Sequence, residues 1–299
     1  MKKVLISGAS GFLGSAVTAD LRRKGYRVVR LVRSRSQVGE DAIFWDPEHR
    51  ILDKDDLEGF DAIIHLSGEN IANARWTEAK KQRIRDSRVF STRLLCENVA
   101  EVKRPPQVLL CASAVGYYGD RDDTMLVEES PRGSGFLADV VVDWERATLV
   151  ARARGIRVVN LRFGVVLGRR GGMLKRILTP FLWCLGGIIG KGKQYVSWIA
   201  IDDVLGVIDH VMHCKQLEGP VNAVSPNPVK NQTLTKILGK VLGRPTCLPM
   251  PAFLAKLLFG ERAETLLLAS TRVYPQKLLD SGYVFQLPDC EEALRVVTK

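Results

Sequence analysis

The chain has 299 residues, of which 46% are hydrophobic and 26% charged, so it is long enough for one large or two modest globular domains. Six scattered cysteines, with no CxxC pair and no His/Cys metal-ligand spacing, argue against a metal site and predict free thiols in a reducing compartment, which we expect to be the cytoplasm. The net charge of +11 is spread over several segments, which favours a solvated basic surface over a nucleic-acid interface.

The first stretch, KVLISGASGFLG at residues 3–14, predicts a short buried strand, a glycine turn and the start of a helix that runs to residue 24. Nothing before it has the apolar length of a signal peptide. Gly8 permits the tight turn, Gly11 lets backbone approach a pyrophosphate, and Gly14 lets the helix pack against the sheet. The diphosphate then lies on free N–H groups at the positive end of the helix. We therefore expect a dinucleotide to contact Gly8, Ser10, Gly11, Phe12, Leu13 and Gly14.

The end of the second predicted strand, at 27–32, decides which dinucleotide is bound. An NAD enzyme usually has an Asp or Glu there, which holds the ribose 2′-hydroxyl. This chain instead has Arg33, Ser34, Arg35 and Ser36. Two guanidinium groups and two hydroxyls suit a 2′-phosphate, which Ser10 could also reach. The sequence therefore predicts NADP(H), with NADPH preferred over NADH; the alternative is an exposed basic loop without a ligand.

Strands and helices alternate through the first 165 residues, which predicts a doubly wound parallel sheet of the Rossmann type, in the α/β class. The strand at 61–66 is nearly all apolar, as a central parallel strand should be. It is followed by Ser67 and Gly68, where backbone can again pass close to a ligand. The other predicted elements are strands at 42–45, 108–111 and 157–161 and helices at 77–102 and 136–154.

Beyond residue 164 the pattern becomes mainly helical, although a strand is predicted at 221–224. The longest apolar run, at 177–189, is broken by Pro180 and glycines and is too short to cross a bilayer, so we expect no membrane partner. We expect a Rossmann domain over 1–168 and about 200–225. A smaller, mainly helical substrate lobe would occupy about 169–199 and 226–299. Helices are predicted at 174–185, 202–212, 233–242, 252–258 and 261–270.

Several motifs together resemble one family along almost the whole chain. They are GASGFLG at 8–14, DAIIHLSGEN at 61–70, ASAVGYYG at 112–119, WE at 144–145, LRFGVVLG at 161–168, WIAIDDV at 198–204 and GRPTCLPMPAFL at 243–254. The chain is similar to atypical extended short-chain dehydrogenases/reductases, in the NAD(P)-dependent epimerase/dehydratase family. Within it, the chain most resembles the "epimerase family protein" subgroup, which has its own small C-terminal domain.

The resemblance implies roles for particular residues. The glycine loop and Leu66, Ser67 and Gly68 would lie along the dinucleotide. Ser113 matches the active-site serine that hydrogen-bonds the substrate oxygen, and 162–164 would border the nicotinamide. Asp202 is expected to cap the helix that follows it, a structural role.

The expected catalytic pair, Tyr-x-x-x-Lys, is missing. Family enzymes carry it on the helix after the serine, where the lysine lowers the pKa of the tyrosine. Here apolar residues occupy both places, either Leu137 and Val141 or Phe136 and Val140. The nearest replacements are Tyr117, our first candidate for the proton donor, and Tyr118. Other acidic candidates, expected to be solvated or to cap the helix, are Asp139, Asp143 and Glu145.

Two functions remain open at this point. The chain is either an NADP(H)-dependent oxidoreductase or epimerase/dehydratase-like enzyme acting on a small unidentified substrate, or a non-catalytic NADP(H)-binding regulator. A homodimer is expected only by analogy with the superfamily. Lys191 and Lys193, in a loop with four glycines, either belong to a mobile lid over an anionic substrate or lie in a passive turn. Trp183, Trp198 and His65 are expected in the core.

Overall fold

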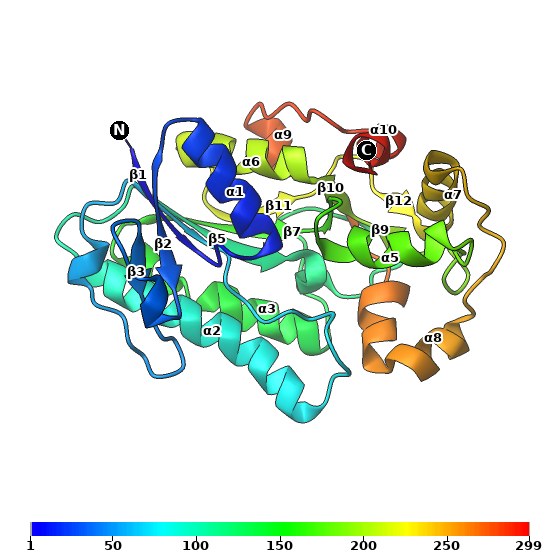
Figure 1. Cartoon of the computed structure of the whole chain (residues 1–299), viewed down its shortest axis with the longest axis horizontal. Coiled ribbons are helices and arrows are strands. Elements are labelled where there is room, and N and C mark those ends of the chain that lie inside the picture. Colours follow the sequence, from blue (N-terminus) through cyan, green and yellow to red (C-terminus); the bar gives the residue numbers. More distant parts are fainter. Residues whose placement is uncertain (1, 299) are drawn as a thin grey trace.

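The computed structural model describes residues 2–298, which fold around one parallel β-sheet (Figure 1). Its seven strands lie in the order β11-β7-β5-β4-β1-β2-β3, and every neighbouring pair is parallel. This is the doubly wound arrangement that the alternation of strands and helices predicted. The strands are β1 (Lys3–Ser7), β2 (Arg27–Val32), β3 (Ala42–Phe44), β4 (Ala62–His65), β5 (Val108–Ala114), β7 (Arg157–Phe163) and β11 (Gly219–Ala223).

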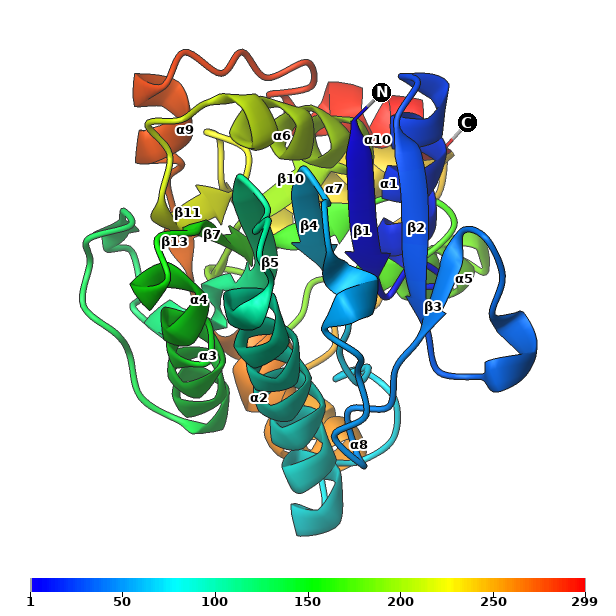
Figure 2. The same ribbon diagram turned by 90° about the vertical axis from the view of Figure 1, so that its left-hand side faces the viewer.

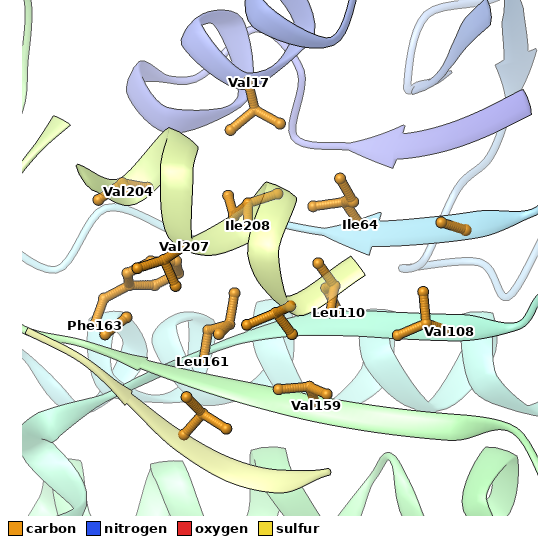
Figure 3. Packing of buried hydrophobic residues seen from close by; sticks show 14 of the residues in the cluster. Val17, Ile64, Val108, Leu110, Val159, Leu161, Phe163, Val204, Val207 and Ile208 are labelled. Atoms are coloured by element: carbon orange, nitrogen blue, oxygen red, sulfur yellow. The ribbon is translucent and has the colours of Figure 1, made fainter. Parts of the chain in front are cut away.

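Helices cover both faces of the sheet (Figures 1 and 2). One face carries α1 (Phe12–Arg23) and α6 (Ile201–His213), and the other carries α2 (Glu78–Glu101), α3 (Phe136–Arg146) and α4 (Leu149–Ala153). The core is therefore divided into two layers of aliphatic side chains. In the first layer, Val17 of α1 and Ile208 of α6 pack over Ile64 and Leu110 (Figure 3). Burial of both faces explains why the central positions of these strands are mostly apolar.

The C-terminal half adds mainly helices beside the sheet, around a third apolar cluster that includes Leu174, Leu238 and Leu294. Its helices are α5 (Gly172–Leu182), α7 (Asn231–Leu242), α8 (Ala252–Phe259), α9 (Gln276–Asp280) and α10 (Cys290–Thr298). Within this half, the short strand β8 (Val165–Leu167) pairs with β10 (Trp198–Ala200), and β9 (Tyr195–Val196) pairs with β12 (Val229–Lys230). A third pair, β6 (Met125–Leu126) with β13 (Arg272–Val273), joins it to the N-terminal part of the chain. Short 3-10 helices are η1 (Arg35–Gln37), η2 (Asp55–Leu57) and η3 (Val115–Tyr118), and η4 (Ala263–Leu268) is a short π-helix.

Three local predictions were wrong. The helix expected at 136–154 is two helices, because the Thr148 hydroxyl bonds the carbonyl of Glu145 at the break. Asp202 does not cap α6, whose N-cap is Ala200 without a side-chain bond. Trp183 is 75% exposed, whereas Trp198 is buried as expected. Among the described residues, no helix has the length and apolarity needed to cross a membrane.

The buried carboxylate next to Asp202 has a different structural role. Asp203 accepts hydrogen bonds from the backbone N–H groups of Gln286 and Leu287, at 2.7 and 3.0 Å, and from the Tyr283 hydroxyl at 3.1 Å. It thereby fixes the segment that leads into α10 against the first turn of α6. Burial, followed by the charge of Asp203, raises the pKa of Tyr283 far above its usual range, so this phenol stays protonated.

Candidate functional site

The glycine turn after β1 forms a cradle of bare backbone, in which Gly8 and Gly14 have no room for a side chain. Gly8 has φ +71°, and a Cβ there would lie 2.8 Å from the carbonyl carbon of Leu66. A Cβ on Gly14 would lie 2.1 Å from the oxygen of Gly8, so α1 can start this close to the turn only with glycine. The amide of Gly11 closes the turn on the Gly8 carbonyl at 3.0 Å. Bare backbone at this position fits a dinucleotide diphosphate.

The N-terminus of α1 is open to an anion. Its N-cap is Gly11, which contributes no side-chain hydrogen bond, and its first turn holds no acidic residue. The last turn carries Arg22 and Arg23, which complement the negative end of the helix dipole. The uncapped N–H groups at the positive end are thus left for a ligand or water. Ser10 is exposed beside them, and Phe12 and Leu13 form the start of the helix.

Arg33, Ser34, Arg35 and Ser36 directly follow β2, the strand next to β1, and all four are exposed. Arg35 stacks on the ring of Phe44, with its guanidinium carbon 4.3 Å from the ring centroid. The hydroxyls of Ser34 and Ser36 are 2.8 Å apart. Within residues 2–298, no carboxylate forms an ion pair with Arg33 or Arg35. Both guanidinium groups are therefore available to a phosphate, with Arg35 already held in place by Phe44.

The loop after β4 lies between the glycine turn and β5, because β4 pairs with both β1 and β5. Leu66 contacts the turn directly, since its amide bonds the backbone oxygen and hydroxyl oxygen of Ser7 at 3.3 and 3.2 Å. Ser67 is half-buried and Gly68 is exposed. The structure thus brings the predicted Leu66–Gly68 segment against the predicted glycine turn.

Ser113, near the end of β5, is 3% exposed and donates a hydrogen bond of 2.6 Å to Oε1 of Glu145. Glu145 lies near the end of α3, and its carboxylate is held by Arg162 of β7. We expected Glu145 to be solvated or to cap the helix, which was wrong: its side chain is only 15% exposed, and that of Arg162 only 3%. Ser113 has one hydroxyl proton, and it is donated to Glu145. Toward any further partner the serine oxygen can therefore act only as a hydrogen-bond acceptor.

The two tyrosines after β5 have different surroundings. Tyr118 is fully buried, donates to Asn222 Oδ1 at 2.8 Å and accepts from Arg162 Nη1 at 3.0 Å. Burial raises the pKa of Tyr118 to about 12, against the opposing effect of Arg162. Tyr117 is partly exposed, and its ring lies 3.5 Å from the guanidinium carbon of Arg162. Tyr117 also borders a cavity of about 340 Å³ that runs along α3, α4 and the start of β11. Tyr117 is thus the more accessible phenol.

Burial and the electrostatics of Glu145 act in opposite directions on Arg162. Burial by itself would lower the pKa of this guanidinium, but the hydrogen bonds and negative charge of Glu145 outweigh it and raise the pKa. The guanidinium of Arg162 therefore stays charged. Of the other acidic candidates, Asp139 pairs with Arg132 and Asp143 with Arg85, both near the surface and away from Ser113.

The two positions at which the family carries Tyr-x-x-x-Lys hold apolar side chains that pack against the rest of the protein. Val141 is buried, and the Cβ atom of Leu137 lies 3.4 Å from where a Cβ on Gly116 would be. Neither side chain can exchange a proton.

His65 lies in the core, as expected. Its Nδ1 is 2.6 Å from the Ser7 hydroxyl, and Nε2 is 3.3 Å from that of Ser91. Burial lowers its pKa to about 4, so the imidazole is neutral at pH 7. Within the described part of the chain, no cluster of His, Cys, Asp and Glu could hold a metal ion.

The glycine-rich loop at 186–193 is tied down along its length. The backbone amides of Gly190 and Met250 bond the carbonyls of Met250 and Ile188, both at 2.8 Å. The amide of Ile189 bonds Asn231 Oδ1 at 2.9 Å. These bonds favour the passive turn over the mobile lid. Lys191 and Lys193 point to the surface, where both are exposed.

Comparison with known proteins agrees with this geometry. The model of the "NAD dependent epimerase/dehydratase family" matches residues 4–223, and that of a "domain of unknown function", DUF1731, matches residues 250–297. The Epimerase family protein Mb2239 of Mycobacterium bovis is 41% identical over 99% of this chain and 97% of its own length. The mouse Epimerase family protein SDR39U1 is 36% identical, with 99% of both chains covered.

Solved structures show the same relationship. The human epimerase family protein SDR39U1, crystallised with NADPH, superimposes with a TM-score of 0.91 at 33% identity, over 99% of this chain and 98% of that one. UDP-glucose 4-epimerase of Thermotoga maritima, with UDP-glucose, has a TM-score of 0.76 at 18% identity, over 99% and 97%, and shares the fold. The chain is similar to the SDR39U1 epimerase family proteins, carries a C-terminal DUF1731 domain, and belongs to the NAD dependent epimerase/dehydratase family.

Proposed function

We propose that this protein binds NADP(H) along the glycine turn and uses it in oxidoreductase- or epimerase-type chemistry on a small substrate. The observation that carries the proposal is the cradle of Gly8 and Gly14 under an uncapped helix N-terminus, next to the two unpaired guanidinium groups of Arg33 and Arg35. The presence of NADPH in the human SDR39U1 structure, a 33% identical relative, supports the same cofactor here.

In this proposal the diphosphate lies over Gly8, Ser10, Gly11 and the first turn of α1, formed by Phe12, Leu13 and Gly14. The 2′-phosphate lies between Arg33, Ser34 and Arg35, and the chain from Leu66 to Gly68 borders the rest of the dinucleotide. The fit is by charge as well as by shape, since the helix N-terminus and both arginines are positive.

The bound cofactor supplies or accepts a hydride at a substrate carbon. In the proposal Ser113 orients the substrate oxygen. Ser113 donates its proton to Glu145 at 2.6 Å, so its oxygen is left to accept a hydrogen bond from a substrate hydroxyl. Tyr117 is the proposed proton donor, because its ring is fixed on Arg162 while its side chain remains partly exposed.

The first test is a calorimetric titration of the purified protein with NADPH and separately with NADH. We expect NADPH to bind at least about ten-fold more tightly, since one charge-assisted phosphate contact is worth about that much. In the variant R33A/R35A the two affinities should become similar, whereas R22A, at the far end of α1, should keep the preference. Equal binding of both cofactors by the unchanged protein would remove the role given to the two arginines.

A second candidate function is an NADP(H)-binding regulator without catalysis. The apolar side chains of Leu137 and Val141, at the positions of the usual acid–base pair, favour it. A panel of alcohols, aldehydes, ketones and sugar nucleotides, followed by NADPH absorbance, separates the two. Stoichiometric binding of NADPH with no turnover of any compound would support the regulator. We also propose a reducing, cytoplasmic location, consistent with six free cysteines.

A further inference from the structure

Arg88 of α2 is a partly buried cation that forms no ion pair within the described residues, although the charge of Glu69 acts on it and partly opposes the effect of burial. Its Nη1 donates to the carbonyl of Ile84 and its Nη2 to the carbonyl of Glu69, both at 3.0 Å. Within residues 2–298, no carboxylate lies in ion-pair range of it. The nearest acid, Glu69, has its carboxylate paired with Lys80. Two of the five guanidinium N–H donors are thus used, and both bonds go to neutral oxygens.

Besides these two carbonyls, the guanidinium of Arg88 contacts a glycine and an aromatic ring. The guanidinium lies against Gly68, so that a Cβ there would be 3.3 Å from its central carbon. Its other neighbour is the ring of Trp144, with the centroid 5.2 Å away. Burial lowers the pKa of Arg88 to about 10, which means that the folded protein holds this charge at a cost. An anion bound beside it would offset that cost.

The position of Arg88 relates it to the substrate end of the proposed site. Gly68 follows β4, which lies between β1 with the glycine turn and β5 with Ser113. Trp144, on which Arg88 stacks, directly precedes Glu145, the partner of Ser113. Gly68 is exposed, and the Arg88 side chain that contacts it is itself partly exposed. Arg88 therefore contacts the loop after β4, the strand that lies between the glycine turn of β1 and the Ser113 strand β5.

We propose that the substrate is a small organic acid and that the guanidinium of Arg88 binds its carboxylate. A planar guanidinium confined between Gly68 and a tryptophan ring, with free N–H donors, is suited to a planar carboxylate. The proposal extends the proposed function and relies on its placement of the substrate near Ser113.

The test compares benzoate with benzamide, which have nearly the same shape and differ in charge. Binding of each to the NADPH-saturated protein is measured by ligand-observed NMR at constant ionic strength. We expect benzoate to bind about ten-fold more tightly than benzamide. R88M and R88Q should abolish the preference, R88K should keep part of it, and R93M, an exposed arginine of the same helix, should keep all of it.

The controls separate this inference from the cofactor and from folding. The affinity of R88M for NADPH should stay within about three-fold of the unchanged protein; a loss of ten-fold or more would place the guanidinium on a cofactor phosphate and overturn the substrate assignment. No preference for benzoate in the unchanged protein, or a preference that survives in folded R88Q, would also overturn it. If the protein binds no NADPH, the proposed function fails, but the benzoate preference can still be measured without cofactor.

Discussion

Arg162 holds both carboxylate oxygens of Glu145, with Nε 2.8 Å from Oε1 and Nη2 2.9 Å from Oε2. Because α3 carries Glu145 and β7 carries Arg162, this ion pair ties a helix to the sheet next to Ser113. E145A would leave the arginine charge buried without its partner, and we expect the free energy of unfolding to fall by about 3–5 kcal/mol. Urea denaturation measures this loss.

Two further variants define the pair. E145M/R162M removes both charges and should recover much of the stability, since no unpaired charge remains. D139A breaks the exposed pair with Arg132 and should change the free energy of unfolding by less than about 1 kcal/mol. A small effect of E145A, equal to that of D139A, would contradict the strength assigned to the buried pair.

The glycine turn should tolerate no added methyl group. G14A places a Cβ on the Gly8 carbonyl and G8A forces a left-handed backbone on alanine, which costs roughly 1–3 kcal/mol before any clash. We expect both variants to melt at lower temperature and to bind NADPH at least ten-fold more weakly. G39A is the matched control, because Gly39 has no atom within 4 Å of its Cβ position. Unchanged NADPH affinity in G14A would exclude this turn as the cofactor site.

Ser113 should affect turnover without affecting cofactor binding. With a substrate from the panel, S113A is expected to lower kcat by about 100-fold, the scale on which a misplaced substrate slows a reaction, while the Kd for NADPH stays the same. S36A removes a hydroxyl at the opposite end of the proposed site and should leave kcat unchanged. A large loss of NADPH affinity in S113A would refute this division of roles.

His65 should make the protein sensitive to acid. Its pKa is about 4 in the folded state and ordinarily 6.5, so the unfolded chain binds the proton first as the pH falls. The associated stability is fully present above pH 6.5 and is lost progressively toward pH 4, by about 3 kcal/mol. Denaturation between pH 7 and pH 4 should show a flatter profile for H65Q than for the unchanged protein. The exposed His213 provides the control H213Q, which should retain the steep profile.

The sheet could be predicted from the sequence because its signals are local. A strand such as β4 is a continuous apolar run, and Gly8 and Gly14 mark the turn that follows β1. Contacts between distant residues gave no such signal. Glu145 looked like a surface residue of a helix, because its partner Arg162 approaches from a strand 17 positions later.

Arg88 illustrates the same limit. In sequence it is one of several basic residues on a long polar helix, and its apolar surroundings come from Gly68 and Trp144, which the fold brings together. Likewise, Trp183 lies in an apolar run but follows the last residue of α5 and faces solvent. Periodicity identifies the helix there, but not which residues at its end are covered.

The place of β11 in the sheet has a consequence for synthesis on the ribosome. β7 ends at Phe163, and its neighbour β11 begins only at Gly219. At roughly 5–20 residues per second, the intervening segment takes about 3–11 s to translate. During this time the nascent chain presents the open hydrogen-bonding edge of β7, which is a template for wrong pairing. We therefore expect the nascent chain to need a chaperone until β11, the last strand of the sheet to be synthesised, leaves the ribosome.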